Sequence, residues 1–561
     1  MKKIAKFLSL LLCATLMPIV SGCGTVTPPP EQPSLPVPQE FTDRSGWVPF
    51  IPETFPAGSE LKIRFFKGGY GREWLDAAKE KFEAEYEGVT IRLIESTTEA
   101  DFTTLLPEML NNNAADIFMC HNIPWEKMAL QGKIMNLDAL YGSTVYTDIK
   151  NLDDDGKPLN VTYLDRVAPS SLNGVRMNVN DAPGYFRVPQ VQGSGGLAYN
   201  KTLFAQNGWQ IPKTYQELIA LCDTINSSGA KNASGDTIAP IVWGGSNDSA
   251  FLWDSIVFDW WVQMAGMDEF DRFMKFEDKT VFNPEVYPYL KQAWTYWYDF
   301  LVKNPGYSLS GSIGLNNLTT NMAFAAGQAA MTPATCWFAN EVGFDVLEQF
   351  NCDVGIMPTP LVPEVRKNAD QSPIRVSYDL AGKDSIIVGN RASNNSKMLA
   401  QEFLKWLALE ENALLFPKHT NGLLLAMRYD FDNMLAAFEP GYITEDDLDP
   451  DLEGLTEDEQ YFKRNEIRHK KLYAGIAQTT WAKDMFAILN TSTRFNLYSG
   501  SAMTWNAPTP LSPYPDGNYY AEAFERWGTA EADTRSPDSV FNGVWTRIDS
   551  QWDTMRAAAG L

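Results

Sequence analysis

Two aromatic side chains follow short apolar runs of the chain and lie beside small or polar residues. Trp337 comes five residues after the run 329–332, and Tyr70 lies in the glycine-rich segment 68–71. Sugars and similar polyhydroxylated solutes expose flat C–H faces and a rim of hydroxyl groups. Binding them takes aromatic rings beside amide, carboxylate or guanidinium groups in a concave site. The sequence therefore offers side chains for stacking and hydrogen bonding.

The candidate ligand-binding side chains lie after expected strands, in expected crossover segments or near a helix start. They are Trp337, Tyr70, His121, Asn122, Gln192, Ser194, Trp243, Asp248, Trp253, Asp379 and Arg428. Each also has a structural alternative. A tryptophan is often largely buried, a tyrosine among glycines can pack over a helix end, and polar crossover residues can cap backbone groups. Helical spacing places Trp260 and Trp261 in the core.

A catalytic function stays open at the level of the sequence. Hydrolysis of a glycosidic bond needs two carboxyl groups that face each other across the bond. The 70 acidic residues of the chain always allow such a pair to be proposed. No G-x-S-x-G or H-E-x-x-H motif is present. We therefore expect a binding protein without catalytic residues, and a surface-anchored glycoside hydrolase or lyase is the alternative.

Composition argues against nucleic acid and against a metal centre. The chain has 46 basic and 70 acidic residues and a net charge of −24, whereas binding to phosphate backbones needs cations. Its six cysteines form no C-x-x-C pair, and it has three histidines. The acidic segments 151–156 and 445–459 approximate calcium ligands, but a solvated loop and an acid-rich helix start explain them equally well. We expect no metal and no cofactor.

The first residues have the pattern of an export signal. Lys2, Lys3 and Lys6 precede an apolar run over residues 7–20, which is too short for a comfortable membrane span. The sequence Val-Ser-Gly-Cys at 20–23 resembles the bacterial lipobox, whose cysteine becomes a diacylated N-terminus. We expect residues 1–22 to be a lipoprotein signal peptide and Cys23 to anchor the protein in the lipid bilayer. An ordinary cleaved signal is the alternative.

Proline dominates the next segment. Residues 23–59 contain the run Pro28-Pro29-Pro30 and further prolines up to Pro56, a composition typical of an extended tether. No later stretch reaches about 18 uncharged apolar residues, the length that a spanning helix needs. We therefore expect the remaining chain to lie on the extracellular or periplasmic side of a bacterial cell membrane.

Strand and helix patterns alternate in the first part of the body. Apolar runs at 61–66, 89–94 and 116–120 predict strands, and apolar residues at three- and four-residue spacing over 74–86 and 102–110 predict helices. Strand–helix alternation is typical of crossover units and a parallel sheet. Open sheets of this kind bind ligands beyond the carboxyl ends of their strands, where Tyr70, His121 and Asn122 would lie.

The same alternation resumes further along the chain. We expect strands at 195–200, 238–243, 329–332 and 385–388, and helices at 250–265, 286–302 and 393–409. Thr214 and Glu217 predict a capping box at the start of another helix. One sheet rarely includes so many units. The sequence therefore predicts an α/β fold with two lobes, each a mostly parallel sheet flanked by helices.

Four segments together resemble the extracellular solute-binding protein family 1 of the carbohydrate-transporter type, and the chain is distantly similar to maltose-binding protein. They are the strand and loop at 61–71, the strand and loop at 116–121, the segment 188–201 that ends in Tyr-Asn-Lys, and Ala330-Met331-Thr332 with Trp337. The resemblance covers about residues 60–430. Asn122 and Gly193 stand where maltose-binding protein carries acids, which makes maltose itself an unexpected ligand.

The resemblance implies a two-lobed, periplasmic-binding-protein-like fold that closes over its ligand by a hinge motion. We expect residues 60–190 and 383–430 to form the N-terminal lobe, and 191–382 and 431–561 the C-terminal lobe. The hinges would lie near 190–196 and 377–382. The implied function is capture of a sugar or oligosaccharide by a monomer and its delivery to the membrane permease of an ABC importer.

Overall fold

The structure is a computed structural model that describes residues 55–96, 98–120, 123–152, 158–172, 174–180, 182–245, 250–275, 277–379, 384–476, 479–496 and 536–558. All of these residues belong to one unit, Ser34–Leu561. Within the described part of the chain, no helix combines the length and the apolar character that crossing a membrane requires.

The first sheet has five strands in the order β2-β1-β3-β15-β8. These are β2 (Val89–Ser96), β1 (Ser59–Phe66), β3 (Ile117–Cys120), β15 (Ser385–Val388) and β8 (Val188–Pro189). In β1 the residues Leu61, Ile63 and Phe65 are buried, the alternation that gives a strand one apolar face. β1 pairs in parallel with β2 and β3, but β15 runs antiparallel to both β3 and β8.

The second sheet has four strands in the order β11-β12-β10-β13. These are β11 (Ala239–Ile241), β12 (Ala329–Thr335), β10 (Gly195–Asn200) and β13 (Val354–Met357). Only β11 and β12 are parallel, since β10 runs antiparallel to both β12 and β13. The expectation of mostly parallel sheets is therefore wrong in detail. Both sheets are mixed because strands from distant parts of the chain join them in the opposite direction.

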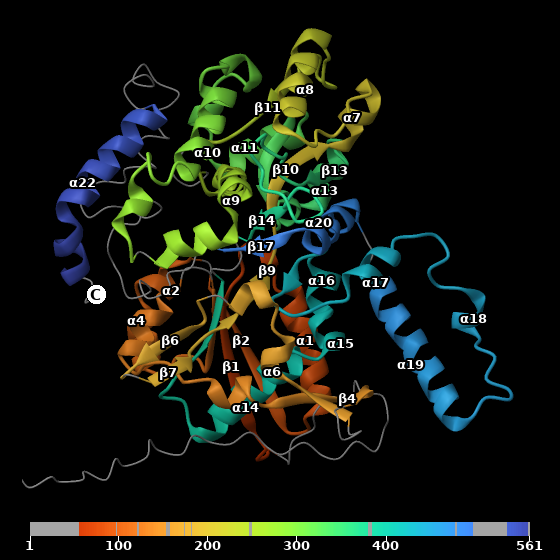
Figure 1. The fold of residues 1–561 in the computed structure, drawn as a ribbon. Coiled ribbons are helices and arrows are strands. Elements are labelled where there is room, and N and C mark those ends of the chain that lie inside the picture. Colours follow the sequence, from red (N-terminus) through yellow and green to blue (C-terminus); the bar gives the residue numbers. More distant parts are fainter. Residues whose placement is uncertain are drawn as a thin grey trace, which may run out of the picture. The chain divides into compact units, whose positions relative to one another are not determined.

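Helices lie against the first sheet (Figure 1). Large apolar side chains make the contacts between them. α1 (Glu73–Glu85) buries Trp74, Leu75, Ala78 and Phe82, and the ring of Phe82 meets Phe403 of α14 (Asn394–Leu407) edge-on at 5.3 Å. The helix expected over 102–110 is instead two short helices, α2 (Ala100–Thr103) and α3 (Leu106–Asn111). Proline near the start of α3 explains the break, because its ring suits only the first helical turn.

Two helices that accompany the second sheet, α8 and α9, show the capping and the burial expected from the sequence. Thr214 and Glu217 form the predicted capping box of α8 (Tyr215–Ser228). α9 (Ala250–Lys275) continues beyond the expected end, although Gly266 interrupts it with φ 75° and ψ 167°. Trp260 and Trp261 are fully buried, which confirms their placement in the core.

Two small sheets pair segments that are far apart in the sequence. β9 (Val191–Gln192) pairs with β16 (Leu424–Leu425), and β14 (Val376–Tyr378) pairs with β17 (Thr493–Phe495). Both pairs lie in or next to the segments expected to cross between lobes.

The other elements are short or peripheral. Those before residue 250 are η1 (Gly68–Tyr70), α4 (Trp125–Leu130), α5 (Asp138–Tyr141), β4 (Thr144–Leu152), β5 (Pro158–Thr162), α6 (Tyr163–Arg166), η2 (Pro169–Leu172), β6 (Arg176–Val179), β7 (Ala182–Tyr185) and α7 (Lys201–Asn207). Between residues 275 and 350 they are η3 (Lys279–Phe282), α10 (Tyr289–Trp297), η4 (Tyr298–Val302), η5 (Pro305–Tyr307), η6 (Ser312–Gly314), α11 (Asn317–Ala325), α12 (Phe338–Val342) and α13 (Phe344–Gln349). The last group is α15 (Glu410–Ala413), α16 (Leu415–His419), α17 (Phe431–Ala436), α18 (Glu445–Leu448), α19 (Glu457–Ala474), α20 (Thr480–Thr491) and α22 (Pro537–Ala558).

Candidate functional site

Trp337 and Tyr70, the two aromatic residues expected to stack on a ligand, lie together. Trp337 is half-buried at the start of α12, after β12. Tyr70 ends η1 after β1 and is buried, with 8% of its surface exposed. Their rings meet edge-to-face with centroids 6.4 Å apart and planes at 87°. Two loops that follow strands of different sheets thus form one aromatic corner, and an edge-to-face pair holds both rings in fixed orientations.

Gly69 allows this close approach. A Cβ atom at this position would lie 3.0 Å from Cβ of Trp337 and 3.1 Å from Cγ of Glu341. These contacts are tighter than ordinary van der Waals contact, so a larger residue would require Trp337 and Glu341 to shift by a few tenths of an ångström. In the glycine-rich loop predicted from the sequence, the absence of a side chain at Gly69 therefore allows η1 to lie close to α12.

Glu341 and Asn317 supply polar groups beside the aromatic corner. Glu341 lies one helical turn after Trp337, and its backbone N–H donates to the Trp337 carbonyl oxygen at 3.0 Å. Its carboxylate accepts a hydrogen bond from Asn317 Nδ2 at 3.3 Å. The Glu341 side chain is exposed to solvent, but protein atoms around the carboxyl partly desolvate it and raise its pKa to about 7, while the hydrogen bond from Asn317 acts to lower the pKa. The sequence analysis missed both residues, although the four-residue spacing from Trp337 was a usable signal.

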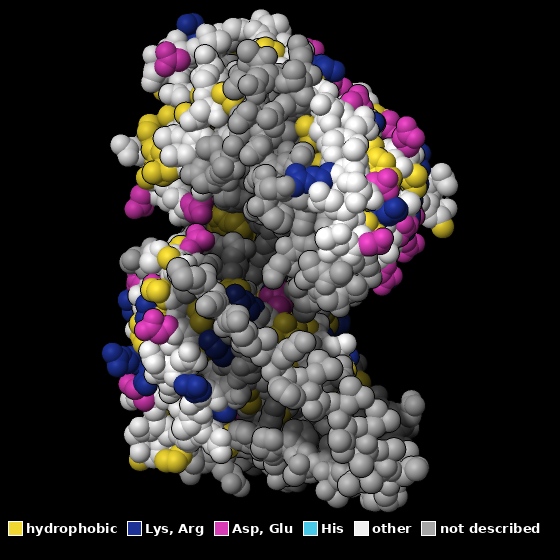
Figure 2. Space-filling view, turned by 90° about the vertical axis from the view of Figure 1, so that its left-hand side faces the viewer, with side chains coloured by type: hydrophobic (Ala, Val, Ile, Leu, Met, Phe, Trp, Pro, Cys, Tyr) yellow, Lys and Arg dark blue, Asp and Glu magenta, His cyan; other side chains and the backbone are white. Residues whose placement is uncertain are grey.

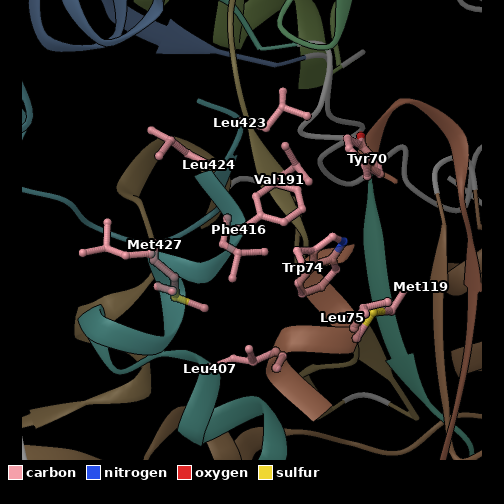
Figure 3. Close-up of a cluster of buried hydrophobic side chains, with 14 of the residues drawn as sticks. Tyr70, Trp74, Leu75, Met119, Val191, Leu407, Phe416, Leu423, Leu424 and Met427 are labelled. Atoms are coloured by element: carbon pink, nitrogen blue, oxygen red, sulfur yellow. The ribbon is translucent and has the colours of Figure 1, made fainter. Parts of the chain in front are cut away.

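Apolar side chains support the corner from below (Figure 3). Phe416 of α16 lies 5.9 Å from the Tyr70 ring and 4.8 Å from the Trp74 ring, measured between centroids. The loop after α16 also reaches α12, since Asn340 Nδ2 donates to the Thr420 carbonyl oxygen at 2.6 Å. The side chains of Tyr70 and Trp74 therefore rest on a rigid base, which favours a preformed site.

Gln192, Ser194 and Asp379 are brought together, but they hold the chain crossings. Gln192 Nε2 donates to the carbonyl oxygens of Leu425 at 2.8 Å and Met427 at 2.5 Å. Asp379 Oδ1 accepts from the backbone N–H of Gly193 at 3.0 Å, and the hydroxyl of Ser194 contacts that of Ser377. All three predicted residues are buried, which fits the structural alternative of backbone capping.

Arg494 joins this cluster and was not predicted. Its guanidinium donates to Oε1 of Gln192. Burial lowers the pKa of the guanidinium, and the Asp379 carboxylate acts in the opposite direction. No local motif marks Arg494, because its partners lie more than a hundred residues away.

The other predicted ligand residues lie elsewhere. Trp243 is 4% exposed, donates from Nε1 to Ser308 Oγ at 3.0 Å and packs edge-on against Trp297, which places it in the core of the second sheet. Arg428 is exposed, and its backbone N–H donates to the Arg166 carbonyl oxygen. Trp253 lies in α9, and its side chain is outside the described part of the structure. His121, Asn122, Asp248 and Cys23 lie outside the described residues.

The acidic run 445–459 uses two of its carboxylates to cap helices. Asp447 pairs with Thr444 at the start of α18, and Glu459 pairs with Thr456 at the start of α19. Among the residues that the structure describes, no group of three or more His, Cys, Asp or Glu side chains has a metal-binding arrangement.

One face of the molecule is visibly hollowed (Figure 2). Hydrophobic side chains are visible inside the hollow, and both basic and acidic side chains lie near its margin. A recess with mixed apolar and charged surroundings is the usual form of a small-molecule site.

The fold is that of known solute-binding proteins. A probable secreted solute-binding lipoprotein from Streptomyces coelicolor matches with a TM-score of 0.52 and 14% identity, over 87% of this chain and 98% of the other. The bacterial solute receptor AcbH, described as having an exclusive preference for β-D-galactopyranose, matches with a TM-score of 0.55 and 14% identity, over 89% and 100%. The solute-binding protein RafE in complex with raffinose matches with a TM-score of 0.51 and 14% identity, over 86% and 98%.

The sequence identifies the family. The bacterial extracellular solute-binding protein family matches residues 68–414, and the chain belongs to this family. Its members are binding receptors rather than enzymes, which confirms the expectation of a binding protein rather than an enzyme. A curated relative, the diacetylchitobiose binding protein NgcE of Streptomyces coelicolor, is 25% identical over 176 residues. That alignment spans 31% of this chain and about a third of the relative, 33% of its length.

Proposed function

We propose that this protein captures a sugar or oligosaccharide and delivers it unaltered to the permease of an ABC importer. The observation that carries the proposal is the corner formed by Trp337 and Tyr70, with Glu341 beside it. The half-buried Trp337 ring can cover the C–H face of a sugar, and the buried Tyr70 ring supports it from behind. The Glu341 carboxylate can accept hydrogen bonds from the sugar hydroxyls, and the Asn317 amide can donate and accept them. The sugar ligands named for structures with the same fold support a carbohydrate as the ligand class.

The binding site would lie between two lobes. The strands of the first sheet come from residues 59–189 and 385–388, and those of the second sheet from 195–357. These ranges agree with lobes at 60–190 and 383–430, and at 191–382 and 431–561. η1 follows a strand of the first sheet and α12 follows a strand of the second, so a ligand at the corner would touch both lobes.

Anchoring completes the proposal. Diacylation of Cys23 would hold the protein at the outer surface of the bacterial cell membrane, and the proline-rich segment 23–59 would let the body reach the permease. His121, Asn122 and Asp248 stay predicted ligand contacts, because in the sequence each follows an expected strand, as Tyr70 and Trp337 do.

A glycan panel tests the proposal. The chain without residues 1–23 is incubated with raffinose, galactose, diacetylchitobiose and longer glycans, and its thermal midpoint and the released products are measured together. We expect one class of sugar to raise the midpoint and to be recovered intact. Cleavage products would favour the hydrolase or lyase alternative, and a midpoint that no sugar changes would refute carbohydrate capture.

A further inference from the structure

Glu341 is a charged residue beside the aromatic corner, one helical turn after Trp337. We infer that Glu341 accepts hydrogen bonds from the hydroxyls of the bound sugar, and that sugar binding at this carboxylate releases a proton. This inference rests on the proposed function and adds a specificity-determining residue to it. It also predicts a pH dependence of binding that the aromatic rings alone would not produce.

The helix α12 places Glu341 on the face that carries Trp337. Residues four apart lie one above the other on a helix, so the carboxylate points along the same side as the indole. Cγ of Glu341 lies 3.1 Å from the position that a Cβ of Gly69 would occupy, and its Oε2 lies 3.3 Å from Asn317 Nδ2. The carboxylate thus stands between η1 and α11, next to the ring on which a sugar would stack. The hydrogen bond from Asn317 leaves other lone pairs of the carboxylate for hydroxyl donors.

The charged neighbours of Glu341 do not neutralise it. Among the described residues no Lys, Arg or His forms an ion pair with this carboxylate. Arg72, which follows η1, is paired with Asp76 and Glu95. Several elements packed against α12 carry titratable groups. These are Tyr70 on η1, Cys336 before α12, Asp345 and Glu348 on α13, Lys418 and His419 at the end of α16, and Lys483 and Asp484 on α20, whose Trp481 ring packs against Phe338. α11 carries none within its bounds.

Desolvation of the Glu341 carboxyl explains why this group can carry a proton that sugar binding would release. The surrounding protein raises the pKa of Glu341 to about 7, so an appreciable fraction of the carboxyls is protonated near neutral pH. Sugar hydroxyls donate hydrogen bonds more strongly to a carboxylate than to a neutral carboxyl. Binding therefore favours the ionised form, and the proton passes to the buffer. If the pKa falls by about one unit on binding, affinity becomes about tenfold higher well above pH 7 than well below pH 6.

Calorimetric titration of the best sugar from the panel tests the inference. Binding is measured between about pH 5.5 and pH 8, in pairs of buffers with different ionisation enthalpies, so that the number of released protons is obtained directly. The wild-type chain is compared with Glu341→Gln, which keeps the size of the side chain and a carbonyl acceptor but cannot titrate. The matched control is Glu126→Gln. Burial also raises the pKa of Glu126 to about 7, but Glu126 lies on a different helix, α4, and not on α12.

We expect the wild type and Glu126→Gln to release a proton fraction near pH 7 and to bind several-fold more tightly at the higher pH. Glu341→Gln should bind equally at both pH values and with the lower affinity. Proton release that persists in Glu341→Gln, or disappears in Glu126→Gln, overturns the inference. Sugar binding by the wild type with no pH dependence refutes only this inference, whereas failure of every sugar to bind refutes the proposed function as well. The thermal midpoint of each variant without sugar checks that it is folded.

Discussion

At the scale of single residues, the contrast between two tryptophans separates ligand binding from packing. Trp337 is half-buried beside Tyr70, whereas Trp243 is enclosed in the core of the second sheet. We expect Trp337→Ala to weaken sugar binding by about 1–3 kcal/mol, because a stacking ring is lost, while the fold is retained. Calorimetry with the sugar identified in the panel measures this loss.

Trp243→Ala is the matched control for a lost indole. Removing a buried aromatic ring should lower the free energy of unfolding by about 3–5 kcal/mol, which urea titration measures. An unchanged sugar affinity in Trp337→Ala would assign Trp337 to packing and would remove the main support for the binding site.

At the scale of elements, Asp259 joins α9 to the chain crossing at β14. Its carboxyl accepts from Thr359 Oγ1 at 2.5 Å and from the Tyr378 backbone N–H at 2.6 Å. Burial raises the pKa of this carboxyl well above its ordinary value of 3.8. The stability that it contributes is therefore present below pH 3.8 and is lost as the pH rises through the folded-state pKa. In Asp259→Asn we expect the free energy of unfolding to fall less between about pH 4 and about pH 8 than in the wild type, as measured by urea unfolding at both pH values.

Asp447 is the control of opposite sign. Hydrogen bonds from the Thr444 backbone and hydroxyl, together with Lys470, lower the pKa of Asp447, so its stabilising effect is lost as the pH falls through the folded-state pKa. Asp447→Asn should therefore remove stability at high pH and leave it unchanged at low pH. If the free energy of unfolding depends on pH in the same way in the wild type and in Asp259→Asn, the pKa of Asp259 is not raised as assigned.

Local patterns predicted more of the elements than of their arrangement. The strands β1, β2, β3 and β15 and the capping box of α8 follow from alternation and capping, which depend on near neighbours. The direction of β15 beside β3 depends on where the chain returns after the second sheet, and no local signal records it. The same distinction applies to the site. Tyr70 and Trp337 were predicted from their strand-end positions, whereas Arg494 acquires its partners only in the folded chain.

At the scale of the whole molecule, Gln192 connects three distant segments. It binds the carbonyl oxygens of Leu425 and Met427 and accepts from Arg494. Gln192→Ala would remove the hydrogen bonds to both carbonyl oxygens and the hydrogen bond from the Arg494 guanidinium. The Leu425 carbonyl oxygen would still accept from the Met427 backbone N–H, and each buried group left unsatisfied costs about 1–3 kcal/mol. We expect a clearly lower thermal midpoint and an unchanged sugar affinity. Loss of affinity without loss of stability would instead support the predicted role of Gln192 in ligand binding.

The expected lipid anchor gives a prediction in cells. Cys23→Ala should shift the protein from the membrane fraction to the medium or periplasm, because the acylated residue would be missing. Fractionation followed by immunoblotting measures the distribution. A variant that stays with the membrane to the same extent as the wild type would show that the protein is retained by other means.

The late position of β15 has a consequence for biogenesis. β15 lies between β3 and β8 in the first sheet, yet residues 385–388 are made long after the strands on either side of it. Until they emerge from the ribosome, one edge of β3 has no pairing partner and the five-stranded sheet is incomplete. Pairings over such long separations form slowly. The first sheet is therefore complete only after every strand of the second sheet has been synthesised.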